Sequence, residues 1–186
     1  MEKYTAIKER VVKYKNMLDQ VTEWRSTWSK YLKKFILKEI DKLLEATGLE
    51  ATISEEEKIK GLESITIKLG NKKSGIYEMP TDGNERKDFF KEYGSLVYSQ
   101  LFNGKVQVWM TYPFIEGLIE PRPPQLIGIY APPEFNELLI ITHMEAFLKD
   151  LTEWEDFDDD DNPNAAAPPK TQIGFGFATA PEEPEE

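Results

Sequence analysis

The chain has 186 residues, of which 40% are hydrophobic and 31% charged, and its formal net charge is −11. It contains no cysteine, which excludes disulfide scaffolds, thiolate metal sites and thiol catalysis. No apolar run approaches the ~20 residues of a membrane span, and the first residues lack the apolar region of a secretory signal. We therefore expect a cytoplasmic protein that does not bind a membrane.

The charge is unevenly distributed along the chain. Residues 1–48 carry 11 basic and 7 acidic side chains, whereas residues 145–186 carry 2 basic and 13 acidic ones. Such asymmetry is typical of an acidic tail that follows a folded body.

The first 48 residues are predicted to be helical. Residues 3–47 contain neither glycine nor proline, and Gly48 is suited to cap a helix. Serine and threonine side chains between Thr22 and Ser29 lower helix propensity, so we expect either one long helix or two helices with a break near Ser26.

Apolar side chains recur in this segment at alternating spacings of three and four residues, which is the pattern of a helical stripe. One interpretation is that the stripe covers the protein's own sheet. The other is a seam between copies of the chain, which predicts a homo-oligomer and most simply a dimer. The candidate oligomer seam consists of Ile7, Val11, Tyr14, Leu18 and Val21.

Residues 49–155 are predicted to form an α+β body. Residues 50–60 are expected to be a polar connector, residues 63–69 and 76–79 two strands, and residues 85–93 one or two helical turns. The Asn103-Gly104 dipeptide suits a two-residue type I′ turn between strands 95–102 and 105–114. In that register Tyr98 lies opposite Trp109.

Prolines between Pro121 and Pro133 indicate a loop, after which apolar residues up to Leu151 have helical spacing. We expect this C-terminal helix to start at Pro132, because proline is tolerated in a first turn. Residues 156–186 are interpreted as an acidic low-complexity tail. It contains an apolar island, the candidate tail docking motif Ile173, Phe175 and Phe177.

The predicted fold class is therefore α+β. A long N-terminal amphipathic helix (residues 1–48) precedes a body (residues 49–155) that contains a four-stranded antiparallel meander and the C-terminal helix. The acidic tail (residues 156–186) completes the chain.

No motif predicts catalysis, a cofactor or a metal site. His143 is the only histidine, and without a second histidine or cysteine it cannot anchor an ordinary zinc site, so we interpret it as structural. The acidic run from Asp158 has prolines where a calcium loop needs glycine and glutamate. Glu116 and Glu120 form a possible carboxylate pair, but nothing in the sequence indicates a shifted pKa for either.

One face of the predicted hairpin is rich in aromatic and amide side chains, which can stack bases or sugars or anchor a protein partner. The alternative is that a helix covers this face and that its aromatic residues belong to the core. The candidate binding face consists of Tyr98, Gln100, Phe102, Gln107 and Trp109.

These observations favour a non-enzymatic interaction or assembly protein, with protein partners, a helix-mediated oligomer and a partner-recruiting tail. One alternative is a single-stranded nucleic-acid-binding protein with an autoinhibitory acidic tail, although the body lacks the clustered basic residues that phosphate binding needs. Another alternative is an acidic chaperone or adaptor.

Overall fold

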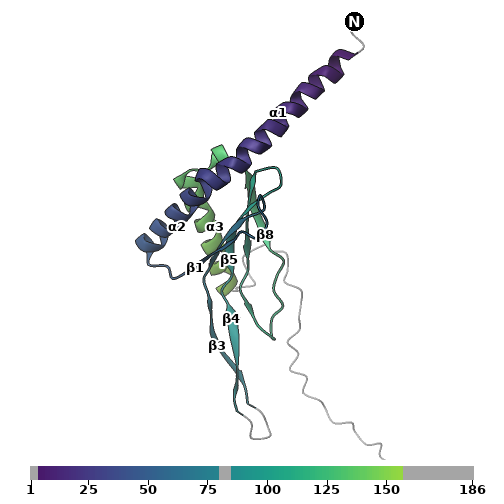
Figure 1. Ribbon diagram of the computed structural model, residues 1–186. Coiled ribbons are helices and arrows are strands. Elements are labelled where there is room, and N and C mark those ends of the chain that lie inside the picture. The colour runs from purple at the N-terminus through teal and green to yellow at the C-terminus, as the bar shows by residue number, and fades with distance from the viewer. Residues whose placement is uncertain (1–3, 80–84, 157–186) are drawn as a thin grey trace, which may run out of the picture. The chain divides into compact units, whose positions relative to one another are not determined.

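The structure is a computed structural model that describes residues 4–79 and 85–156. The chain divides into two units, residues 1–156 and residues 157–186. The first unit has the predicted α+β class (Figure 1). The predicted acidic tail beyond Asp156, with the docking motif Ile173, Phe175 and Phe177, lies outside the described residues.

The N-terminal segment is one continuous helix. Helix α1 (Thr5–Thr27) passes through a π-helical turn, η2 (Trp28–Leu32), into α2 (Lys33–Thr47). Of the two alternatives that the sequence left open, one long helix or a break near Ser26, the structure has the first, and its π turn begins at Trp28. Gly48 ends the helix in the left-handed conformation (φ 68°) and donates its N–H to the carbonyl of Leu44 at 2.9 Å.

Five antiparallel strands form the larger sheet, in the order β1-β2-β5-β6-β8. The strands are β1 (Thr52–Glu56), β2 (Ser64–Lys68), β5 (Ser95–Gln100), β6 (Val106–Thr111) and β8 (Gln125–Tyr130). Strands β1 and β8 were not predicted, since the polar residues of the first and the flanking prolines of the second indicated a connector and a loop.

A second sheet has three antiparallel strands, in the order β3-β4-β7. Its strands are β3 (Asn71–Glu78), β4 (Lys87–Glu92) and β7 (Phe114–Ile115). The helical turns predicted over residues 85–93 are therefore wrong, because β4 occupies them. The structure has more strands than the predicted four-stranded meander, but its fold class is the predicted one.

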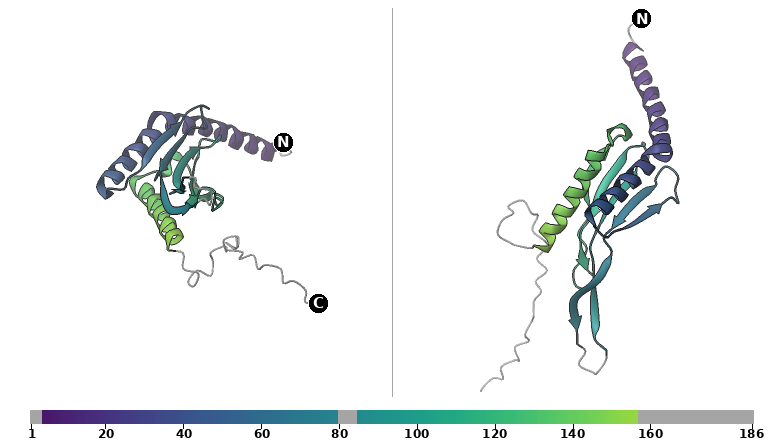
Figure 2. Two further views of the ribbon diagram at one scale, coloured as in Figure 1. Left: turned by 90° about the horizontal axis from the view of Figure 1, so that it is seen from below. Right: turned by 90° about the vertical axis from the view of Figure 1, so that its left-hand side faces the viewer.

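The helices cover one face of the five-stranded sheet. Helix α3 (Glu137–Glu155) lies beside α2 on this face (Figure 2). Helix α3 begins later than predicted. The residues Pro132–Glu134 form a separate 3-10 turn, and Asn136 caps α3 by accepting the Leu139 N–H at 2.9 Å.

The core lies between these helices and the sheet. Trp28, Leu32, Ile36 and Ile40 from the long helix face Ile140, Met144, Phe147 and Leu151 from α3 and the inward side chains of β2, β5 and β6. The helical segment from Trp28 onward thus covers the protein's own sheet.

The hairpin exists where it was predicted, but the predicted register is wrong by one residue. The Leu101 N–H donates to Lys105 and the Gly104 N–H donates to Leu101, which makes a three-residue loop. Only Gly104 has a positive φ, at 78°, whereas a type I′ turn needs one at Asn103 as well. Tyr98 consequently lies opposite Val108, and Trp109 lies opposite Val97.

Candidate functional site

The five residues of the predicted binding face do not share a face. Because a one-residue shift of register turns side chains to the other side of a sheet, Tyr98 and Gln100 point into the core, at 0% and 3% exposure. Gln107 and Trp109 lie half-buried on the opposite face, and Phe102 is 72% exposed in the hairpin loop. The predicted aromatic face is therefore corrected to two separate groups of residues.

Tyr98 belongs to a buried polar cluster with His143. The Tyr98 hydroxyl lies 3.3 Å from His143 Nδ1, and the rings of Tyr130 and Phe135 pack around the imidazole. Burial lowers the pKa of His143 to about 4 and raises the pKa of Tyr98. At 1% exposure His143 is part of the packed core.

Two unpartnered polar groups lie in the same core. No hydrogen-bond partner among the described residues is found for Nε2 and Oε1 of Gln100 or for Nε2 of His143. Burying such groups lowers stability unless something satisfies them.

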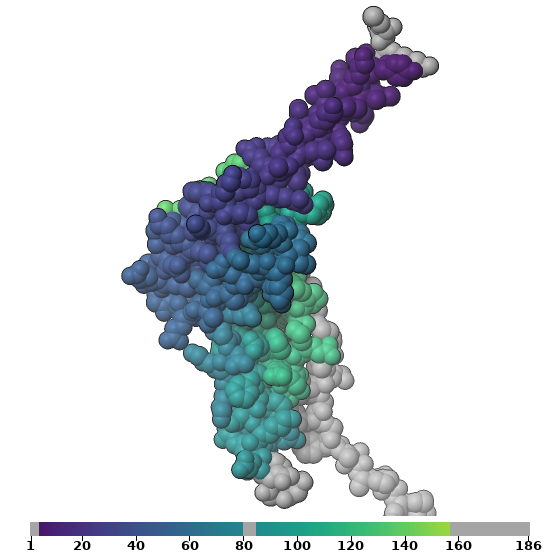
Figure 3. Space-filling view, in the orientation of Figure 1, coloured from purple at the N-terminus to yellow at the C-terminus, as the bar shows by residue number. Residues whose placement is uncertain are grey.

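The predicted oligomer seam lies on the protein surface. Every described side chain from Tyr4 to Gln20 is exposed, and α1 has no buried residue. The exposed fractions of Ile7, Val11, Tyr14 and Leu18 are 58%, 45%, 64% and 48%, and Val21 is half-buried. Figure 3 shows these first turns of α1 in purple, clear of the sheets on the face in view.

We call this row the α1 stripe: Tyr4, Ile7, Val11, Tyr14, Leu18 and Val21. Near its C-terminal end α1 contacts the hairpin loop, where Arg25 donates to the carbonyl of Phe102. That contact fixes the helix at one end, and the α1 stripe from Tyr4 to Leu18 has no partner in the described part of the chain.

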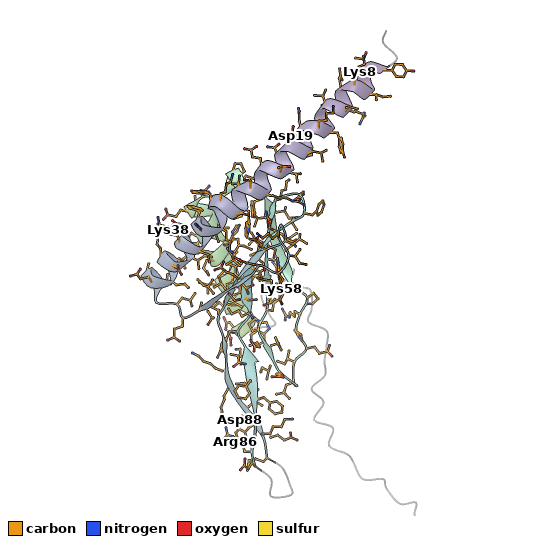
Figure 4. All side chains as sticks on the ribbon, in the orientation of Figure 1. Lys8, Asp19, Lys38, Lys58, Arg86 and Asp88 are labelled. Atoms are coloured by element: carbon orange, nitrogen blue, oxygen red, sulfur yellow. The ribbon has the colours of Figure 1, made fainter. Side chains whose placement is uncertain are left out.

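Basic side chains border the α1 stripe on both sides. At 100° per residue, Lys8 and Lys15 lie along one border and Arg10 along the other. Glu9 and Glu23 lie on the opposite, polar side of the helix, whereas Asp19 lies next to the border that carries Lys8 and Lys15. Figure 4 labels Lys8 and Asp19 on α1.

A groove of about 390 Å³ runs between α2 and α3. We call it the α2–α3 groove. Its floor is apolar and consists of Leu43, Ala46, Ile140, Ile141, Met144 and Leu148.

The rim of the α2–α3 groove is acidic. Glu39, Glu137 and Glu145 line it together with one base, Lys42. Lys42 is engaged by Glu39 at 2.8 Å, and this hydrogen bond raises the pKa of the lysine. Glu137 lies close enough for its charge to act on Lys42 as well, so the rim has three acids against one base and an excess of two negative charges.

Sequence reasoning did not find this groove, although α3 carries a signal for it. Ile140 is buried in the core and its neighbour Ile141 lines the groove together with Leu148, so the apolar side of α3 is wider than one sheet contact requires.

A second exposed region lies on β3 and β4. Arg86 stacks over the Tyr77 ring at 3.9 Å, and Lys73 and Arg86 both bind Asp88, whose pKa they lower. Figure 4 places Arg86 and Asp88 near one end of this pair of strands. The ion pairs are exposed and contribute little to stability.

Among residues 4–79 and 85–156, no group of three potential metal ligands is found. Glu116 and Glu120 are both exposed, and Asp158 lies outside the described residues. No described helix is long and apolar enough to cross a membrane. Comparison with known proteins gives no match to a family model, a curated protein or a solved structure.

Proposed function

We propose that this chain is a non-enzymatic, cytoplasmic assembly protein that forms a homo-oligomer through the α1 stripe. Residues 156–186 serve in this proposal as a segment that recruits a further protein partner. The observation that carries the proposal is the exposure of the α1 stripe.

Without a partner, the apolar side of α1 would remain exposed to water and would contribute little to the stability of the helix. Its 23 residues span roughly 35 Å, and most of the stability of helices in proteins comes from packing of an apolar side rather than from helix propensity. Apolar side chains at i, i+4, i+7 and i+11 are the pattern of a helix that docks in a groove or against another helix. Polar residues at these positions would serve a solvated helix better.

The proposal predicts an oligomer that depends on the α1 stripe. Changing Val11 and Leu18 together to Asp should convert the oligomer to a monomer, because each change would bury a charge in an apolar contact. Both positions are exposed in the single chain, so its fold should be retained. Size-exclusion chromatography with light scattering measures the mass.

The matched control is Val12→Asp. Val12 is 57% exposed on the same turns of α1 but lies about 100° around the helix from Val11, outside the α1 stripe. It should leave the mass unchanged. A monomeric wild-type chain at high concentration would contradict the proposal.

A further inference from the structure

The α2–α3 groove matches α1 in length. Its lining runs along α3 from Glu137 to Leu148, eleven residue steps and roughly 17 Å. The α1 stripe from Ile7 to Leu18 also covers eleven steps, so its anchors can lie along the whole groove floor.

The charges of the two surfaces are complementary. The α1 stripe is bordered by Lys8, Arg10 and Lys15, and the exposed acids of the groove rim are Glu137 and Glu145. An apolar helix side with basic borders thus meets an apolar floor with an acidic rim. Complementary charges of this kind favour encounter and fix register.

Pairing of α1 with α1 lacks this complementarity. In a parallel pair of α1 helices, Arg10 of one copy lies against Lys15 of the other. In an antiparallel pair, the border that carries Lys8 and Lys15 faces itself. Like charges beside the seam oppose both arrangements.

If α1 occupies the α2–α3 groove, that helix has to come from another molecule. Helices α1 and α2 form one continuous helix (Figure 1). Helix α2 is itself a wall of the groove. Helix α1 therefore cannot turn back onto its own groove without breaking at the η2 turn, whose Trp28 and Leu32 are buried in the core.

We propose that α1 of one copy docks in the α2–α3 groove of a second copy. The inference rests on the proposed function and names the surface that the α1 stripe contacts. Each copy contributes one helix and one groove, so two different surfaces meet, and either a reciprocal dimer or a ring satisfies every contact.

A charge exchange tests the proposal on the full-length chain. One variant carries Lys8→Glu and Lys15→Glu, which gives an acidic helix beside an acidic groove. The other carries Glu137→Lys and Glu145→Lys, which gives a basic helix beside a basic groove. Each variant alone should associate at least roughly tenfold more weakly than wild type, because like charges now face each other.

An equimolar mixture of the two variants should regain association, since each helix then meets a groove of opposite charge. The matched control carries Glu116→Lys and Glu120→Lys, the same charge change on an exposed loop away from the groove, and it should associate as wild type does. Light scattering measures the masses, and far-UV circular dichroism checks that each variant is folded.

The failures of the two proposals are distinguishable. If Glu137→Lys with Glu145→Lys associates like wild type while Val11→Asp with Leu18→Asp is monomeric, α1 docks elsewhere and this inference is wrong, although the proposed function stands. If Val11→Asp with Leu18→Asp still associates like wild type, both are wrong. If the mixed variants stay monomeric, the groove assignment is overturned.

Discussion

His143 links the stability of the core to pH. Its imidazole is buried beside Tyr98, and the pKa is lowered from 6.5 to about 4 by burial. Above pH 6.5 the ring is neutral in both the folded and the unfolded chain. As the pH falls, the unfolded chain binds the proton first, so the free energy of unfolding decreases until the folded pKa is reached.

We therefore predict a loss of roughly 2 kcal/mol of unfolding free energy between pH 7 and pH 5. Urea unfolding at several pH values measures it. The carboxyl groups of Glu57 and Asp88 also have lowered pKa values, but they titrate below this interval and act only in more acidic solution. His143→Gln should remove the dependence, and an equal slope in wild type and variant would contradict the argument.

For Gln100 we predict that a substitution leaves stability unchanged or increases it. Its amide is 3% exposed and has no hydrogen-bond partner among the described residues. Gln100→Met keeps the approximate volume and removes the unsatisfied polar atoms, so it should be neutral or stabilise the fold by about 1 kcal/mol. The urea midpoint measures this, and a clear loss of stability would show that a partner such as a buried water satisfies the amide.

At the scale of elements, α1 packs closely against the hairpin loop. Gly104 has φ +78°, and a Cβ there would lie 2.7 Å from Cβ of Trp24 and 3.0 Å from the Arg25 backbone nitrogen. We predict that Gly104→Ala costs more than the backbone strain alone, because the side chain collides with α1.

Gly75 provides the control for this prediction. It has a similar φ of +84°, but a Cβ there meets nothing within 4 Å. Gly75→Ala should cost about 1 kcal/mol from the left-handed backbone, and Gly104→Ala about 1–3 kcal/mol more from overpacking. Chemical denaturation of the two variants measures the difference. Equal losses would mean that α1 yields readily at this contact.

The same contact explains which part of the sheet the sequence could predict. Asn-Gly identifies a hairpin, but the dipeptide is compatible with loops of two and of three residues. In the structure the three-residue loop contacts Trp24 and Arg25, which are about 80 residues away along the chain. The presence of a hairpin could be predicted from neighbouring residues alone. Its register, and therefore which side chains point to which side of the sheet, could not.

Strands β4 and β8 were missed for related reasons. The sequence Lys87–Glu92 places its phenylalanines side by side between charged residues, so it lacks the alternation of a half-buried strand. The strand Gln125–Tyr130 lies between prolines, which are acceptable at a sheet edge but indicate a loop in a single sequence.

The candidate site was partly predictable. The α1 stripe followed from spacing alone, because a helix keeps its period whether or not a partner is present. The α2–α3 groove did not, since α2 and α3 are about 90 residues apart in sequence and their walls meet only through the fold.

At the scale of the molecule, the two surfaces that the proposal joins carry unlike charge. The basic excess of residues 1–48 lies partly on the borders of the α1 stripe, and the acids Glu137 and Glu145 lie on the rim of the α2–α3 groove. Both sets are exposed in the single chain, so dissolved salt can screen them.

This arrangement makes the effect of salt informative. Raising the salt concentration from about 0.05 M to about 0.5 M screens the attraction between the basic borders of the helix and the acidic rim of the groove. It also screens the repulsion that a net charge of −11 creates between copies in either arrangement. Two variants of equal net charge separate these effects: Glu137→Lys with Glu145→Lys, and the control Glu116→Lys with Glu120→Lys. If α1 docks in the groove, the rim variant should gain association with salt relative to the control, because only there does salt screen a repulsion between helix and rim. Light scattering of both variants over this range of salt measures the difference, and an equal response of the two would contradict docking in the groove.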